Sequence, residues 1–260
     1  MFSFRTYYAY RELIWNLVAA DLKNRYKSSA LGFLWSFMNP LLTSLVLIFV
    51  FTQVFQFRDV GGNYPLYLIS GIIPWRFFAY TLSSMKSVTT YASLIRKIYF
   101  PRQILVVSSC LSALVSASIE FAILLLIAVI LGASITPWIL LVPAFVLVQF
   151  LLVMGFSLAL SALYVYFQDL EHIWEVVLQA GFYAAPIIYP STLIPQASPY
   201  YVVLLANPMS HFIITYRHLI MYGDAPALGS LVGIAFFTVS AYAAGLLIFK
   251  RLEPHFAEEI

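Results

Sequence analysis

A compact basic cluster is the first feature that could do chemistry, in the stretch SLIRKIYFPRQ (residues 93–103) between two apolar blocks. Basic clusters beside a membrane either bind anionic groups or fix topology. If the cluster only fixed topology, the cations alone would be sufficient. The three bulky apolar residues and the adjacent proline instead form a rigid apolar projection that could fill a cleft in a partner protein. Both interpretations stay open from the sequence. The residues concerned are Arg96, Lys97, Ile98, Tyr99, Phe100, Pro101 and Arg102.

Catalysis, metal binding and nucleotide binding have no support in the sequence. The chain contains no Gly-Lys pair, and therefore no loop of the kind that cradles nucleotide phosphates. His211 and His218 are spaced to share a helix face, but such a lone pair is more often interfacial than a metal site. We therefore expect no enzyme activity and no cofactor in this chain.

Glu120 is a carboxylate within apolar sequence, next to an uncharged run of 48 residues (residues 121–168). Charge inside a membrane segment is costly and usually functional. Glu120 could pair with Arg76 or Lys86, contact water, or be protonated. We favour a pair or a water contact over proton coupling.

The composition predicts an integral membrane protein. Hydrophobic residues make up 62% of the chain and charged residues 10%, against about 25% charged residues in soluble domains. Three uncharged runs cover residues 28–57, 121–168 and 225–249. A spanning helix needs about 20 apolar residues, so the longest run must fold back once, at GASITPW (residues 132–138).

Hydropathy therefore predicts an all-α fold, with residues 1–260 forming a single transmembrane domain. Residues 191–222 contain Pro195, Pro199 and Pro208, which favour short re-entrant outer helices over one further crossing. Six spans are expected near residues 31–57, 65–92, 104–131, 138–167, 174–190 and 227–249.

An amphipathic helix is expected at residues 5–27. Tyr10, Ile14, Val18, Leu22 and Tyr26 repeat every four residues on one face. This pattern is typical of a helix lying at the membrane surface. The alternative is a solvated helix that packs its apolar face against the rest of the protein.

Orientation follows from the distribution of lysine and arginine. Under the six-span prediction, the N-terminal segment, the stretch 93–103 and the C-terminus share the basic side, and the opposite side has only Arg58, Arg76 and Arg217. Cytoplasmic loops carry the excess of positive charge. We therefore expect both termini in the cytoplasm and the stretch 93–103 as a short cytoplasmic loop.

Aromatic residues are abundant, with 5 Trp, 18 Tyr and 22 Phe. A membrane-interface belt explains most of them. The clusters PWRFFAY (residues 74–80) and FYAAPIIYP (residues 182–190) exceed this need, and aromatic faces also stack on sugar rings. Candidate channel-lining residues are Trp75, Phe78, Tyr183 and Tyr189.

Five blocks, in order, resemble the type 2 ABC exporter permeases, most closely those for lipid-linked polysaccharides such as O-antigen and teichoic acid. Together they cover nearly the whole chain. They are RYKSSALGFLWSFMNPLL (residues 25–42), YPLYLISGIIPWRFF (64–78), LIRKIYFPRQIL (94–105), FQDLEHIWEVVLQAGFYAAPIIYP (167–190) and NPMSHFIITYR (207–217).

The resemblance implies a homodimeric permease in the cytoplasmic (inner) membrane. Two copies of a separate ATPase would bind ATP and magnesium, and the loop between spans two and three would dock into them. The cargo would be a polymer on undecaprenyl diphosphate, passing between the two permeases. Lys23, Arg25 and Lys27 are candidates for the lipid headgroup, since phosphate binds such cations.

One departure and two rival functions remain. The acidic stretch around Asp169, Glu171 and Glu175 lacks an expected cation, so it could face the ATPase or a permease residue. The rivals are a permease for a drug or small lipid and a membrane assembly subunit that transports nothing.

Overall fold

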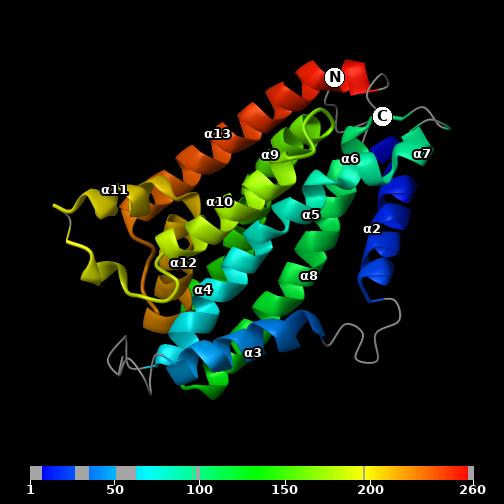
Figure 1. The fold of residues 1–260 in the computed structure, drawn as a ribbon. Coiled ribbons are helices and arrows are strands. Elements are labelled where there is room, and N and C mark those ends of the chain that lie inside the picture. Colours follow the sequence, from blue (N-terminus) through cyan, green and yellow to red (C-terminus); the bar gives the residue numbers. More distant parts are fainter. Residues whose placement is uncertain are drawn as a thin grey trace.

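The structure, a computed structural model, describes residues 8–26, 35–50, 63–95, 97, 100–195 and 197–256. These residues form helices and turns and contain no strand (Figure 1). The expected all-α fold is confirmed for this part of the chain.

Three long helices run along the bundle. They are α8 (Gln103–Ile130), α9 (Val142–Tyr164), which continues from the short helix η3 (Pro137–Leu141), and α13 (Leu228–Leu252). Helix α13 lies at the edge of the bundle beside α9 (Figure 1). Within the described ranges, the three helical stretches Gln103–Ile130, Pro137–Tyr164 and Leu228–His255 are long and apolar enough to cross a membrane. They correspond to the third, fourth and sixth predicted spans.

Small residues bring α9 and α13 into close contact. A Cβ atom added to Gly245 would collide with the carbonyl oxygen of Gly155, and one added to Gly155 would lie 2.6 Å from the backbone of Ala241. Small residues at such a crossing allow two backbones to approach closely. Ala241 and Gly245, four residues apart on α13, therefore serve packing within the chain.

The expected turn between α8 and α9 is present. Gly132 has φ of +78°, and the amide of Ala133 donates to the carbonyl of Ala128 over 2.9 Å. Glycine adopts this left-handed conformation without a steric penalty, and it ends many helices. The long uncharged run thus folds back where the sequence predicts.

The segment predicted as the second span, residues 65–92, is broken into pieces. Helix α4 (Tyr64–Ala79) is followed by the short helices α5 (Thr81–Met85), α6 (Ser87–Thr90) and α7 (Ala92–Ile95). Pro74 lies inside α4 without ending it, and the side-chain amide of Gln149 donates to the Pro74 carbonyl over 2.7 Å.

Helix α2 (Arg11–Tyr26) packs its apolar face against the protein. Ile14, Leu17 and Val18 are buried against Phe100 and the start of α8. The packed face is the one that the four-residue repeat predicts, and its packing matches the alternative interpretation of this helix. Trp15, on another face, is 68% exposed.

Helix α3 (Trp35–Phe49) differs from the expected first span at residues 31–57. It has 15 residues, about 22 Å of helix, and a bilayer core is about 30 Å thick. Figure 1 shows α3 lying across α4 and α8 instead of along them. The remainder of this predicted span lies outside the described residues.

The bundle has two ends, which we call the loop end and the pocket end. The loop end holds Lys97, residues 100–102 and the end of α13, with a contact between Arg102 and Glu253. The pocket end holds the start of α4 and residues 186–195 and 197–200, with a contact between Tyr64 and Ile188. Helix α10 (Leu170–Ala184) runs from the loop end towards the pocket end.

Short helices fill the segment between α10 and α13. Ser198 and Asn207 each cap a helix, because their side chains accept from the amides of Tyr200 and Met209. A proline occupies the first position after each cap, where its missing N–H costs nothing. The elements are η4 (Ser191–Leu193), α11 (Pro199–Ala206), α12 (Pro208–Arg217) and η5 (His218–Tyr222).

Candidate functional site

Helix α10 presents an exposed polar face. Its residues His172, Glu175, Gln179 and Tyr183 are exposed, and spacings of three and four residues place them along one side of the helix. Leu178 is the one residue of α10 that is fully buried. Polar groups inside a bilayer face protein or water, because contact with lipid is costly. The described residues leave this face exposed, so it requires water or a polar neighbour.

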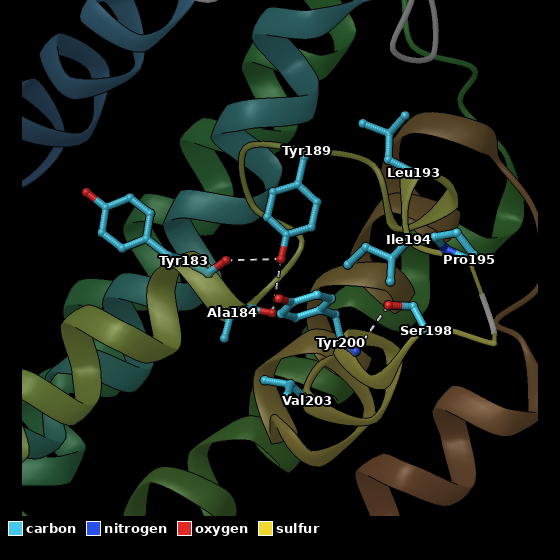
Figure 2. A pocket seen from close by; sticks show the side chains of 9 residues that line it. All are labelled: Tyr183, Ala184, Tyr189, Leu193, Ile194, Pro195, Ser198, Tyr200 and Val203. Atoms are coloured by element: carbon cyan, nitrogen blue, oxygen red, sulfur yellow. Dashed lines mark hydrogen bonds between the residues drawn. The ribbon is translucent and has the colours of Figure 1, made fainter.

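A pocket lined by tyrosines follows at the pocket end, where α10 ends. It has a volume of about 490 Å³, and its lining includes Tyr183, Tyr189 and Tyr200. Figure 2 shows the hydroxyl of Tyr189 directed at the carbonyls of Tyr183 and Ala184, to which it donates over 3.0 and 3.2 Å. Two predicted channel residues, Tyr183 and Tyr189, thus lie together at an open pocket.

The other two predicted channel residues lie in the core of the chain. Trp75 is 7% exposed and Phe78 is 5% exposed. The ring of Trp75 meets Phe182 at 5.9 Å between centroids, and the ring of Phe78 meets Phe156 at 5.3 Å. Their apolar bodies are covered by other aromatic rings, so neither reaches an open surface in this structure.

Arg217 holds the irregular segment that follows α10. Its guanidinium donates to the carbonyls of Pro186 over 2.5 Å and Ile187 over 3.0 Å. The same group donates to the hydroxyl of Tyr67 over 2.7 Å, and the Tyr67 hydroxyl donates to the carbonyl of Tyr189. Non-helical backbone at membrane depth must find its partners inside the protein. Arg217 and Tyr67 supply them.

The site around Arg217 is closely fitted. Its guanidinium carbon lies 3.4 Å from the centre of the Tyr67 ring, and Arg217 is 3% exposed. A Cβ atom on Gly71 would lie 3.0 Å from the guanidinium and 3.3 Å from the Ile187 backbone, so a larger residue there would crowd Arg217. From the sequence alone, Arg217 was expected as a charge of the outer side. The sequence did offer an indication: Pro186 interrupts a predicted span, and the carbonyl groups left without helical partners there need hydrogen-bond donors.

Glu120 pairs with Arg76. The carboxylate lies 3.6 Å from the guanidinium, and the two side chains are 1% and 26% exposed. The pair joins α8 to α4. Of the alternatives left open by the sequence, this contact corresponds to the structural pair.

Glu171 pairs with Lys86 at the loop end. Their charged atoms lie 2.5 Å apart, and the hydroxyl of Tyr164 also donates to Glu171. Hydrogen bonding from Lys86 lowers the pKa of the Glu171 carboxyl. This member of the acidic stretch therefore faces a residue of the permease chain itself, while Asp169 and Glu175 are exposed.

The basic loop is only partly accessible. Phe100 is 5% exposed and packs against α2, so its ring fills an internal position and is not available to a partner protein. Lys97 is exposed, and Pro101 and Arg102 are half-buried. Arg96, Ile98 and Tyr99 lie outside the described residues.

The candidate headgroup cations are less completely described. Lys23 is exposed on α2. The Arg25 side chain and Lys27 lie outside the part that the structure describes. Among the described residues, no group of three or more histidine, cysteine or acidic side chains is arranged to hold a metal ion.

A family comparison covers most of this architecture. The family described as "ABC-2 type transporter" matches residues 12–221. The match includes α2, the basic loop, all of α10 and the segment with Arg217.

Individual relatives match over nearly their whole length. The chain is 32% identical to an O-antigen export system permease protein RfbA of Myxococcus xanthus, over 98% of both chains. It is also 32% identical to an O-antigen export system permease protein RfbA of Klebsiella pneumoniae, over 92% of this chain and 91% of the relative. The polysialic acid transport protein KpsM of Escherichia coli is 24% identical, over 91% of this chain and 92% of the relative.

Proposed function

Because the chain belongs to the ABC-2 type transporter family, we propose that it is the membrane subunit of an ABC exporter for a lipid-linked polysaccharide. The cargo is an O-antigen-like polymer carried on undecaprenyl diphosphate. The chain is a transport permease, and ATP hydrolysis belongs to a separate ATPase subunit, which holds ATP and magnesium.

The observation that carries this proposal is the exposed polar face of α10, which leads to the tyrosine pocket. Gln179 lies about 11 Å along the helix from His172, since each residue adds about 1.5 Å. Tyr183 lies about 17 Å from His172, so the face covers about half of a bilayer core of about 30 Å before the pocket begins. A polysaccharide needs hydrogen-bonding groups along its whole route, whereas a small lipid needs an apolar one.

The tyrosine pocket suits sugar rings at the end of that route. Tyr200 is 73% exposed and Tyr183 is 62% exposed, so both rings are open to a ligand. An aromatic ring offers an apolar face and tyrosine adds a polar hydroxyl, which together match the two faces of a sugar. The full-length similarity to O-antigen permeases supports the same class of cargo.

Two copies of the chain form the path in this proposal. The polar face of α10 would otherwise meet lipid, and a second α10 across a symmetry axis would enclose it. The exposed apolar residues of α3, which include Leu45, Val46 and Phe49, would be covered by the second copy or by lipid. Six spans complete the proposed topology, with α2 at the membrane surface and its apolar face packed against the start of α8.

The loop end faces the cytoplasm of the cell, and both termini lie there. The positive-inside bias supports this orientation, and two internal contacts strengthen it: Arg76, 26% exposed, pairs with Glu120, and Arg217 is buried. Neither of these arginines is a charge of an outer loop. Lys97 and the tip of the basic loop dock into the ATPase, while Lys23, Arg25 and Lys27 receive the lipid diphosphate.

Co-reconstitution with the partner ATPase tests the cargo. ATP turnover should rise several-fold with lipid-linked polysaccharide and remain at its basal rate with drugs or short lipids. Charge-neutral variants of Lys23 should weaken this stimulation more than the basal rate. Stimulation by drugs alone would favour the drug permease, and no stimulation by any cargo would favour an assembly subunit.

A further inference from the structure

Glu253, just after α13, contacts the start of α8. One carboxylate oxygen accepts from the backbone amide of Arg102 over 3.1 Å, and the other accepts from the side-chain amide of Gln103 over 3.2 Å. The Arg102 guanidinium also donates to the backbone carbonyl of Glu253. One residue thus makes three contacts with the junction between the basic loop and α8.

These contacts replace a helix cap. Arg102 is the residue before α8, and its own side chain makes no capping hydrogen bond. Free amides at a helix start prefer an acceptor, and a negative charge there is favourable. Glu253 provides both from a position 151 residues later in the chain. Residue 253 therefore supplies the acceptor that the start of α8 lacks locally.

Phe256 anchors the same segment. It is fully buried, with its ring 5.4 Å from the ring of Phe249 and 6.2 Å from that of Tyr166. The Arg102 guanidinium lies 5.8 Å from its centre. The Tyr166 hydroxyl donates to the carbonyl of Leu252 over 3.2 Å. The end of α9, the end of α13 and the basic loop meet at this one ring.

We infer that residues 253–256 form a clamp that positions the basic loop for the ATPase. The clamp ties the loop to α13, and α13 packs closely on α9 through Gly155 and Gly245. A push on the loop then moves α8, α9 and α13 together instead of bending the loop alone. This inference rests on the proposed function, because the push comes from an ATPase.

Loss of the Glu253 carboxylate should leave the fold intact, whereas Phe256→Ala removes a buried ring and is therefore paired with Phe256→Leu. Glu253 is only half-buried, and water can take over its hydrogen bonds when it is removed. What water cannot restore is the fixed position of the loop. Glu253 and Phe256 are therefore positioning residues, and their variants should separate binding of the ATPase from the use of its energy.

The first arm of the test needs the permease alone. A spin label is attached to Lys97→Cys in a Cys110→Ala background, because Lys97 is exposed and Cys110 is the single native cysteine. Glu253→Gln and Phe256→Ala should each increase the mobility of the label. Asp169→Asn is the matched control, since it removes an exposed carboxylate without a capping contact and should leave mobility unchanged.

The second arm uses the complex with native Lys97. Glu253→Gln and Phe256→Ala should retain the ATPase and its basal turnover, while polymer exported per ATP falls at least threefold. Phe256→Leu, which keeps an apolar anchor, should recover part of the loss. Unchanged label mobility in both variants would overturn the clamp, and increased mobility with unchanged export per ATP would overturn its positioning role.

The two arms separate this inference from the proposed function. If the wild-type permease binds no ATPase, the proposed function fails. The mobility of the label then still decides, without any partner, whether residues 253–256 hold the loop.

Discussion

At the scale of single residues, the charges within the bundle are used to hold the protein together. Arg217 binds backbone carbonyls, and Arg76 binds Glu120. Both arginines lie in apolar sequence, where the first expectation is a functional or topological charge. In the structure, Arg217 contacts the irregular backbone of the pocket end, and Arg76 joins α4 to α8 through Glu120.

Arg217→Lys should destabilise the permease although it keeps the positive charge. Lysine is a point charge and cannot reproduce the fork that reaches Pro186, Ile187 and Tyr67 at once. A buried carbonyl that loses its donor costs about 1–3 kcal/mol. Thermal unfolding in detergent should show a clearly lower midpoint. Arg251→Lys, at an exposed arginine, is the control, and equal midpoints for both variants would contradict this role of Arg217.

Replacing either member of the pair Arg76 and Glu120 should be harmful, and exchanging them should restore function. Removing one partner of a buried ion pair costs about 3–5 kcal/mol, and less here because Arg76 is 26% exposed. Arg76→Glu and Glu120→Arg should each lower stability and export.

The double exchange of Arg76 and Glu120 decides between a structural pair and a proton carrier. Recovery of stability and export in the double variant supports the pair. A stable Glu120→Gln variant that has lost export, together with no rescue in the exchange, would instead identify Glu120 as a proton carrier.

At the scale of elements, predictability follows the length of the uncharged runs. Helices α8, α9 and α13 are recognisable because only a membrane helix explains so many apolar residues in sequence. The breaks after α4 are not recognisable from the sequence, because residues such as Tyr80 and Lys86 fit a continuous helix equally well. Tertiary contacts, including the Lys86 and Glu171 pair, are made at these breaks, and local sequence does not specify them.

Cysteine labelling should find one water-accessible stripe on α10. In a Cys110→Ala background, cysteines at positions 172, 175, 179 and 183 should react quickly with a charged thiol reagent in the membrane, because they line an aqueous path. Cysteines at Ile173 and Val177, on another exposed side of the helix, should react slowly because they face lipid or protein. Equal reactivity at all six positions would contradict a polar path along this helix.

Residues 191–222 should enter and leave the membrane on the same side. Helices α11 and α12 have 8 and 10 residues, so neither can cross alone. Cysteines at Thr192 and Asp224 should both react with an impermeant reagent added from outside. Asp224 is the better label site than Gly223, which has φ of +68° and leaves no room for a side chain. Reaction from opposite sides would establish an additional crossing.

At the scale of the whole molecule, the sequence predicts the class of protein but not which aromatic residues are buried and which line a pocket. Aromatic residues illustrate this limit. Trp75 and Phe78 resemble Tyr183 and Tyr189 in composition and local context, yet the first two are buried and the last two line an open pocket. Phe100 is likewise buried against α2, although its loop has the composition of a docking element. Burial depends on the packing partner, which local sequence does not specify.

Contacts distant in sequence connect the two ends of the molecule. Helix α8 is held at its start by Glu253 and along its length by the pair of Glu120 and Arg76. Just after its end, the side chain of Asn63 donates to the carbonyl of Leu131 over 3.1 Å. Asn63 caps α4, and α4 also contains Tyr67, which binds Arg217. A displacement at the basic loop can therefore reach the pocket end through packed helices and specific polar contacts.

Transport in sealed vesicles tests the central claim most directly. The permease and its ATPase are reconstituted so that the ATPase faces outward, and undecaprenyl-diphosphate-linked polysaccharide is added outside. The account predicts that ATP moves the polysaccharide into the lumen, where an added glycosidase cannot digest it, and that an ATPase lacking hydrolytic activity abolishes this protection. Polysaccharide that stays fully digestible while ATP is hydrolysed, with a drug or short lipid accumulating in its place, would contradict the account.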